Sequence, residues 1–458
     1  MTEAAGASGA GGRSSRAAIL EAPIQATLVR LAWPVAATAL LGEAQGFIST
    51  FWIGRLIGVA GLATLAVMSP VLIALALVGG AVQLGVQVLA ARSAGSQDGK
   101  ALPIIVNGAY LAVAWGFMVM ALGLALFHPI TRALAGDLAI AGSLGNYLLP
   151  FFLFYPVPMV SGVAVFAIGA TGWTRFGLIQ SVVSIGLLVA LMPVFASVLD
   201  FGLGGVALSD GCSDVLLLLL SCYAIYRFRN DLGLGAWQRA YRRLDLGLWR
   251  RILAIGLPYQ LARSMDFIAQ AILVRVMMES GQNATVAGYG VAMLVITLAV
   301  SVFGSLGVAA GVMIGQNVGA KQPERARTIV HLAVTQMLAL GIIVAVVMPF
   351  ADPVFRIFTD DNKVVVQAAS VARALTWIIP ARMLSAALLR AYTAVSPNKL
   401  GNSLSIVCGA ITIVIAYTWP GTELERVTVA VLASGYLRLV LLAVLYRRYF
   451  SAAISYPL

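Results

Sequence analysis

The sequence predicts an all-α membrane protein with twelve transmembrane helices, arranged as two six-helix lobes that are related by a parallel internal repeat. Of the 458 residues, 60% are hydrophobic and only 10% are charged, whereas soluble proteins have about 25% charged residues. The apolar residues form runs that are long enough to cross a bilayer, which takes roughly 20 residues. Several prolines and glycines also recur at one fixed offset between the two halves.

The limits of the spans follow from where the apolar runs begin and end. Six are predicted in the first half, over residues 24–54, 60–91, 103–127, 139–170, 176–198 and 203–226. Six more are predicted in the second half, over residues 252–278, 284–317, 328–350, 364–394, 400–419 and 427–446. We therefore expect an N-terminal lobe over 19–226 and a C-terminal lobe over 252–447, joined by a basic cytoplasmic loop over 227–251.

The two ends of the chain are predicted to be cytoplasmic tails. Residues 1–18 are rich in Gly, Ala and Ser, a composition that favours disorder, and residues 448–458 form the second tail. Most of the 30 Lys and Arg residues lie on the side that contains both tails and the central loop. By the positive-inside rule, both termini are cytoplasmic and the chain is a multi-pass protein of the cell (inner) membrane.

The repeat is defined by the offset from Pro34 to Pro258. The same offset takes Gly95 to Gly319, Pro129 to Pro353 and Pro156 to Pro380. Each half has an even number of spans, so both halves enter the membrane from the same side and their symmetry axis lies along the membrane normal. Two lobes of this kind favour a transporter that works by alternating access.

Short motifs make the chain resemble the multidrug and toxic compound extrusion (MATE) family of secondary transporters. Residues 314–320, Ile-Gly-Gln-Asn-Val-Gly-Ala, are similar to the run that ends the eighth span in that family, and two proline motifs open the first and seventh spans in the same way. The motif positions are Pro34, Pro258, Gly315, Gln316 and Gly319. The resemblance implies an antiporter, not an enzyme, that exports small cationic or amphipathic organic compounds in exchange for protons or sodium.

The expected partners are a small-molecule substrate and the lipid bilayer, and we expect a monomer. No nucleotide-binding Gly-x-x-x-x-Gly-Lys-Ser/Thr motif is present, so ATP is not the direct energy source. The three cysteines and two histidines lack the spacing of a metal site, and no cofactor is expected beyond a coupling ion, H⁺ or Na⁺. The net charge of +12 reflects cytoplasmic loops and does not indicate nucleic-acid binding.

Acidic residues inside the predicted spans are candidate functional groups, because a charge within a membrane costs several kcal/mol. Asp266 lies shortly after Pro258 in the seventh span. The resemblance implies that an acid in this span takes part in cation coupling or drug binding. Arg263 is three residues earlier on the same helical face, so a structural ion pair is the alternative role. The two roles are compatible, since an ion pair can open during transport.

The first span contains a second candidate, Glu43, whose alternative role is to face a polar cleft without coupling. The resemblance also implies an aspartate in the first span and an asparagine in the fifth. This chain has Ser49 and Ser184 at those positions. The cation site of the N-terminal lobe is therefore predicted to be absent or rebuilt.

Asp210 and Asp214, in the sixth span, share one helical face because they are four residues apart. They could form a proton relay or pair with arginines of other spans. The arginines within spans either balance the acids or indicate an anionic or zwitterionic substrate. They are Arg275, Arg373, Arg382 and Arg438. The polar side chains that could line a cleft are Gln45, Ser49, Gln83, Tyr259, Gln260, Gln270 and Tyr289.

Two functions of other classes stay open at this point. A flippase for lipid-linked precursors, from a related superfamily, would need a large basic cleft, and the arginines within the spans favour it. A channel would conduct ions without uphill transport, but no run in the sequence resembles a selectivity filter. The segment 91–98 lacks the Gly-x-x-x-Asp-Arg pattern of the major facilitator superfamily, another twelve-span architecture.

Overall fold

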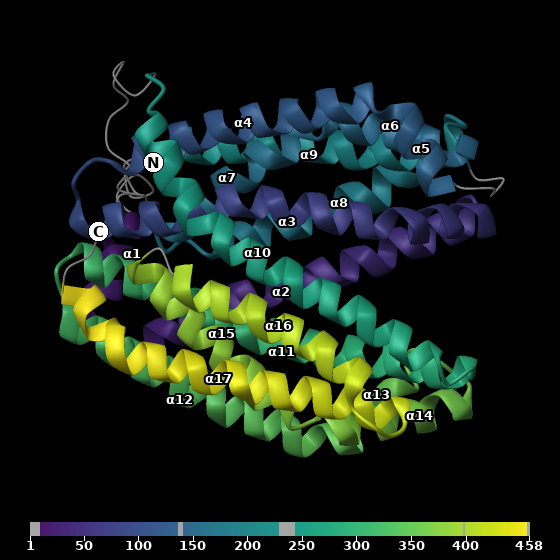
Figure 1. Ribbon diagram of the computed structural model, residues 1–458. Coiled ribbons are helices and arrows are strands. Elements are labelled where there is room, and N and C mark those ends of the chain that lie inside the picture. The colour runs from purple at the N-terminus through teal and green to yellow at the C-terminus, as the bar shows by residue number, and fades with distance from the viewer. Residues whose placement is uncertain (1–9, 136–140, 229–242, 397–398, 456–458) are drawn as a thin grey trace. The chain divides into compact units, whose positions relative to one another are not determined.

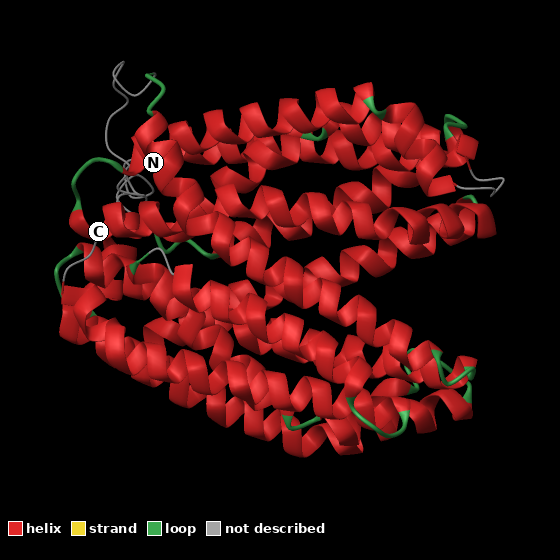
Figure 2. Cartoon of the chain, viewed as in Figure 1, coloured by secondary structure: helices red, strands yellow, loops and turns green. Residues whose placement is uncertain are grey.

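The computed structural model describes residues 10–135, 141–228, 243–396 and 399–455. Helices make up nearly all of this part of the chain, and it contains no strand (Figure 2). Within the same residues, ten helices are long and apolar enough to cross a membrane, and one bent pair adds an eleventh span. The all-α membrane fold that the sequence predicts is confirmed.

The described helices are labelled in Figure 1. From the N terminus they are α1 (Ala10–Glu21), α2 (Ile24–Leu56), α3 (Val59–Ser96), α4 (Ala101–Ala125), α5 (Phe127–Ala135), α6 (Ala141–Phe154), α7 (Pro156–Ala170), α8 (Arg175–Pro193) and α9 (Gly202–Phe228), with a π-helical turn, η1, at Val194–Val198. They continue with α10 (Leu246–Met278), α11 (Asn283–Gly319), α12 (Pro323–Val347), α13 (Asp352–Phe355), α14 (Asn362–Leu375), α15 (Ile378–Val395), α16 (Lys399–Thr418) and α17 (Glu423–Ser455), with a short turn, η3, at Met348–Phe350.

Each of the twelve predicted spans falls on one of these helices or on a helix pair. The predicted fourth span is the pair α6–α7, which is bent by 49°. The predicted seventh span is α10, which is not among the eleven apolar spans. Its 33 residues are ample for a bilayer. Its composition is less apolar because it carries four arginines and Asp266.

The chain divides into two units. Unit 1 consists of Met1–Ala22 and Ala37–Leu257, and unit 2 consists of Pro23–Ala36 and Pro258–Leu458. The boundaries between the units therefore fall between α1 and α2, within α2, and within α10 immediately before Pro258.

The N-terminal tail differs from the disorder predicted over residues 1–18. Residues 1–9 lie outside the described part of the chain, but α1 forms from Ala10. Ile19 is fully buried, and Arg16 donates hydrogen bonds to the carbonyl oxygens of Ala94 (3.2 Å) and Gly95 (2.9 Å) at the end of α3. Carbonyls in a last helical turn have no partner within the helix. Arg16 therefore stabilises the end of α3. The composition of residues 1–18 favoured disorder, but it could not reveal this contact, because Arg16 and α3 are far apart in the sequence.

The central loop also differs from its predicted limits, 227–251. Helix α9 continues to Phe228, residues 229–242 lie outside the described residues, and α10 begins at Leu246. The carboxylate of Asp245 accepts a hydrogen bond from the backbone N–H of Leu248 (3.0 Å), as expected for a helix N-cap. At the other end, α17 includes most of the predicted tail 448–458 and ends at Ser455, and residues 456–458 lie outside the described residues.

The helix packing repeats in the two units (Figure 1). In unit 1, α7 packs against α3, α4 and α9, and α8 packs against α9. In unit 2, α15 packs against α11, α12 and α17, and α16 packs against α17. These pairs occur in the same order along each half of the chain, as a parallel repeat requires.

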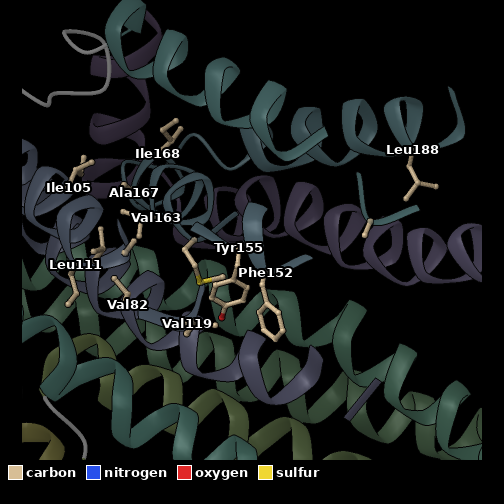
Figure 3. Packing of buried hydrophobic residues seen from close by; sticks show 14 of the residues in the cluster. Val82, Ile105, Leu111, Val119, Phe152, Tyr155, Val163, Ala167, Ile168 and Leu188 are labelled. Atoms are coloured by element: carbon tan, nitrogen blue, oxygen red, sulfur yellow. The ribbon is translucent and has the colours of Figure 1, made fainter. Parts of the chain in front are cut away.

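Unit 1 has a continuous apolar core between these helices. Val82 of α3, Leu111 and Val119 of α4, and Val163 of α7 are all buried in it, together with Phe152 of α6 (Figure 3). The core holds together α3, α6 and α7, three of the helices that line the site described below.

Glycines let α4 approach α7 closely, and α12 approach α15 in the same way. A Cβ atom added at Gly116 would lie 2.6 Å from the Cα atom of Pro156. A Cβ atom added at Gly341 would lie 2.8 Å from the Cα atom of Pro380. Small residues at helix contacts are a main source of packing energy in membranes, where the hydrophobic effect does not drive helices together.

Gly116→Ala is expected to destabilise the protein by about 1–3 kcal/mol, because the added methyl group overlaps the backbone of Pro156. Thermal unfolding of the purified protein in detergent measures the effect. Gly186→Ala on α8 is the control, since no atom lies within 4 Å of its added Cβ and alanine favours a helix over glycine by about 0.5–1 kcal/mol. Equal unfolding temperatures for the two variants would contradict the close packing of α4 and α7.

Candidate functional site

Unit 1 contains a cavity of about 470 Å³. It is lined by residues of α2, α3, α6, α7, α8 and α9, so six segments of the first half of the chain meet around it. Its walls are largely apolar and aromatic, with polar groups at a few positions. The polar lining residues are Gln45, Ser49, Tyr147, Tyr155, Ser184, Asp210, Ser213 and Asp214.

Helix α9 places the two acids on the wall of this cavity. Asp210 and Asp214 are one turn apart and half-buried. Gly211, between them, packs against the ring of Phe154 on α6, where a larger residue would overlap it. Neither carboxylate forms an ion pair or a hydrogen bond with any described residue; the three ion pairs found there involve other acids. Within the part of the chain that the structure describes, the cavity thus presents two acidic groups without a cationic partner.

Hydroxyl groups line the same cavity as these acids. Ser213 is 5% exposed, and its hydroxyl has no hydrogen-bond partner among the residues that the structure describes. Ser49 of α2 and Ser184 of α8 line the same cavity. Carboxylate and hydroxyl oxygens are suitable ligands for hard monovalent or divalent cations. Among the described residues, the cavity included, no group of three His, Cys, Asp or Glu side chains could hold a metal ion.

The structure therefore brings together residues that the sequence left separate. Ser49 and Ser184 occupy the positions at which the MATE resemblance implies an acid and an amide, and both line the cavity. The carboxylates at this cavity come from α9 instead of α2. The depth of Asp210 and Asp214 in their span could not be fixed from the sequence, and their proximity to Ser49 depends on the packing of α9 within the unit.

Two other candidates in unit 1 lie elsewhere. Glu43 is half-buried on α2 and is not among the residues that line the cavity, whereas Gln45 is. Gln83 of α3 packs against Gly162 of α7. It therefore fills a helix–helix contact.

Unit 2 holds the remaining intramembrane acid. Asp266 of α10 forms an ion pair with Arg438 of α17, with 2.7 Å between Oδ1 and Nη1. The side chains of Asp266 and Arg438 are 44% and 21% exposed. The predicted partner, Arg263, is not the partner in the structure. Its guanidinium carbon lies 6.0 Å from the ring centroid of Phe267, so it contacts an aromatic face beside it on the exposed side of α10.

Two further side chains belong to this cluster. Arg382 of α15 interacts electrostatically with Asp266, Arg438 and Tyr289. Tyr289 of α11 is 1% exposed, and its hydroxyl has no hydrogen-bond partner within the described structure. Unit 2 therefore gathers two guanidinium groups, one carboxylate and one phenol from four helices.

Three of the polar residues that were predicted to line a cleft lie on α10, within seven residues of Asp266 in the sequence. The ring centroid of Tyr259 is 4.9 Å from the guanidinium carbon of Arg390, a cation–π contact. The side-chain oxygen of Gln260 is buried without a hydrogen-bond partner in the described residues. Gln270 is half-buried.

The sequence motifs that carry the resemblance shape the helices. Gly315, Gln316 and Asn317 are buried in the last turns of α11, and Asn317 donates a side-chain hydrogen bond to the carbonyl oxygen of Met313 (2.8 Å). Helix α11 ends at Gly319. Pro34 and Pro258 lie inside α2 and α10. None of these positions lines the cavity of unit 1.

Comparison with known proteins agrees with the duplicated architecture. The sequence profile of the MatE family matches residues 34–194 and 258–418, two segments with the same offset as the repeat. The chain is 23% identical over 300 residues to a probable multidrug resistance protein, NorM, of Halalkalibacterium halodurans, with 62% of this chain and 63% of NorM covered. It is also 23% identical over 368 residues to the FAD transporter of Shewanella oneidensis, with 76% and 77% covered.

Solved structures share the fold. An outward-facing multidrug resistance transporter of the MATE family superposes with a TM-score of 0.86 at 19% identity, covering 95% of this chain and 98% of that one. A transporter of the MOP superfamily from Pyrococcus furiosus, whose binding pocket is described as having reverse polarity, superposes with a TM-score of 0.85 at 19% identity, covering 96% and 98%. At this identity, the likeness concerns the fold alone.

The ion pair of Asp266 and Arg438 is expected to couple the two residues energetically. A double-mutant cycle with Asp266→Asn and Arg438→Gln should give a coupling energy of about 0.5–3 kcal/mol, because the side chains are in contact and partly buried. Unfolding in detergent measures each free energy. The control cycle uses Glu324→Gln and Arg327→Gln, which break an exposed pair at 2.6 Å worth at most about 0.5 kcal/mol. A coupling energy no larger than that of the control pair would show that the ion pair of Asp266 and Arg438 does not contribute to stability as expected.

Proposed function

Because the chain belongs to the MatE family of multidrug and toxic compound extrusion transporters, we propose that it is a secondary antiporter. It exports small cationic or amphipathic organic compounds in exchange for protons or sodium ions. One observation carries the proposal: the cavity of unit 1 holds Asp210 and Asp214 without a cationic partner among the described residues.

The two carboxylates supply the reason for coupling. An isolated charge in a low-dielectric environment is costly, so a carboxylate within a membrane needs a proton or a bound cation. In the proposal, the coupling ion meets this need. A proton binds to a carboxylate oxygen of Asp210 or Asp214, and a sodium ion also uses the hydroxyl oxygens of Ser49, Ser184 and Ser213.

The ion can provide enough energy to export a compound that has no net charge. One monovalent cation that enters the cell through a membrane potential of about 100 mV releases about 2.3 kcal/mol. A tenfold concentration ratio costs about 1.4 kcal/mol. One ion per cycle therefore supports a gradient of roughly 50-fold for an uncharged compound. Alternating access then exposes the occupied cavity first to one side of the membrane and then to the other.

The same proposal includes the topology and state of the protein. The duplicated family profile and the many apolar helices make it a multi-pass membrane protein. The distribution of Lys and Arg supports cytoplasmic termini in the cell (inner) membrane. We propose a monomer with two lobes, each carrying one of the two polar sites.

Asp210→Asn and Asp214→Asn are expected to lower gradient-driven efflux by about 10-fold or more, because each removes a charge-assisted contact to the coupling ion. Efflux of a panel of dyes from proteoliposomes is measured with a pH gradient and with a sodium gradient, imposed separately. The gradient that drives efflux identifies the ion.

Asp200→Asn is the matched control for this experiment. Asp200 is an exposed acid between α8 and α9, and its φ of 55° is one that asparagine adopts readily. It should transport like the wild type. Wild-type efflux in the double variant of Asp210 and Asp214, under both gradients, would refute the proposed role of the cavity.

A further inference from the structure

The repeat relates the acidic cavity of unit 1 to the charged cluster of unit 2. The offset continues beyond the segments that the family profile matches, as a pair of glycine contacts shows. Gly211 of α9 packs against Phe154, and Gly435 of α17 packs against Ile378. The two glycines are related by the repeat offset, and so are the two residues that they contact. Helices α9 and α17 are therefore in the same register within their units.

This register shows that the two sites occupy equivalent positions. The cavity residues Gly42, Pro158 and Asp214 of unit 1 correspond in order to Asp266, Arg382 and Arg438 of unit 2. Asp210 corresponds to Ser434. The site in unit 1 thus carries two carboxylates, whereas the equivalent site in unit 2 carries two guanidinium groups and one carboxylate. The same location in the fold has opposite polarity in the two halves.

The cluster in unit 2 has more hydrogen-bond donors than acceptors. Asp266 accepts from Nη1 of Arg438, but Nε of Arg438 is buried without a partner in the described structure. The fully buried hydroxyl of Tyr289 is also without a partner there. Arg382 forms no hydrogen bond to any described residue, although it interacts electrostatically with the other three. Each arginine offers five N–H donors, so one carboxylate cannot satisfy both.

We propose that this cluster binds a carboxylate or phosphate group of the transported compound, so that the substrates are amphipathic organic anions or zwitterions. The proposal rests on the proposed function as an exporter and narrows its substrates: of the cationic or amphipathic compounds named there, it selects amphipathic compounds that carry an oxyanion and disfavours purely cationic ones. A guanidinium group binds both kinds of oxyanion through two parallel hydrogen bonds. The partly exposed side chains of Asp266 and Arg438 make the cluster accessible to a ligand. Asp266 holds Arg438 when the site is empty, and the oxyanion of the ligand joins Arg382 and Arg438.

A cationic ligand fits this site poorly. Its natural partner would be Asp266, whose carboxylate is already paired with Arg438 at 2.7 Å. It would also have to approach the guanidinium group of Arg382, and like charges at close range repel each other strongly in a low-dielectric environment. The excess of positive charge in unit 2 therefore favours an anionic group.

Binding to the purified protein in detergent, without any ion gradient, tests the proposal. Fluorescence anisotropy is measured with a rhodamine dye that has a free carboxylate and with the methyl ester of the same dye. A second pair of probes, methylumbelliferyl phosphate and methylumbelliferone, competes with the dye for the site. This pair tests whether the site also binds a phosphate group. The wild type should bind at least one acidic probe about 10-fold or more tightly than its uncharged or esterified counterpart, as the loss of a charged hydrogen bond predicts.

The variants separate this proposal from a merely structural role of the cluster. Arg382→Gln and Arg438→Gln should each remove the preference for the acidic probe, while Asp266→Asn, which removes the competing carboxylate, should keep or increase it. Arg275→Gln, at an exposed arginine of α10, is the control and should bind like the wild type. Thermal unfolding checks each variant, and Asp266→Asn keeps the test informative if Arg438→Gln does not fold.

Three results would overturn the proposal: equal affinity for acidic and esterified probes, preference for the esterified dye, or loss of the preference in Asp266→Asn with its retention in Arg382→Gln. Each leaves the antiporter proposal standing if dye efflux still follows an ion gradient. Conversely, an acidic-probe preference without gradient-driven efflux would support the ligand site and refute the antiporter.

Discussion

The cost of an unpaired charge inside a membrane constrains both polar sites of this protein. In unit 2 the constraint is met within the chain, because Asp266 and Arg438 form an ion pair at 2.7 Å. In unit 1 it is not met among the described residues, because Asp210 and Asp214 face a cavity without a cation. We propose that a proton or a sodium ion completes the site of unit 1. In this proposal the two halves have different tasks: unit 1 binds the coupling ion, whereas unit 2 pairs its own charges.

The duplicated fold supplies one framework for both tasks. Close helix contacts at Gly116 and Gly341 recur in the two units, as do the contacts of Gly211 and Gly435. The side chains that fix the helices are thus similar, while the few polar side chains at equivalent depth differ in charge. The two units thus share a helix register at Gly211 and Gly435, although the charged residues at the equivalent positions differ.

The sequence was sufficient to predict the features that depend on local pattern. Apolar runs located the spans, repeated prolines revealed the duplication, and the run 314–320 identified the family. The sequence pattern did not predict contacts between residues that are far apart in the chain. Helical spacing favoured Arg263 as the partner of Asp266, but the actual partner is 172 residues away on α17. The presence of Ser49 and Asp210 at one cavity was equally inaccessible, since it depends on how the helices of unit 1 are arranged around it. A composition typical of disorder likewise concealed α1, which is held by tertiary contacts of Arg16.

The role of Asp210 and Asp214 as the ion site is tested most directly by measuring the ions that the purified protein releases when it binds a transported dye. Protons are detected in weakly buffered solution, and sodium is detected with an ion-selective electrode. The wild type and Asp266→Asn should release an ion on dye binding, whereas the double variant Asp210→Asn, Asp214→Asn should bind the dye and release none. Wild-type ion release from the double variant, or its loss in Asp266→Asn alone, would contradict the assignment of the ion to unit 1.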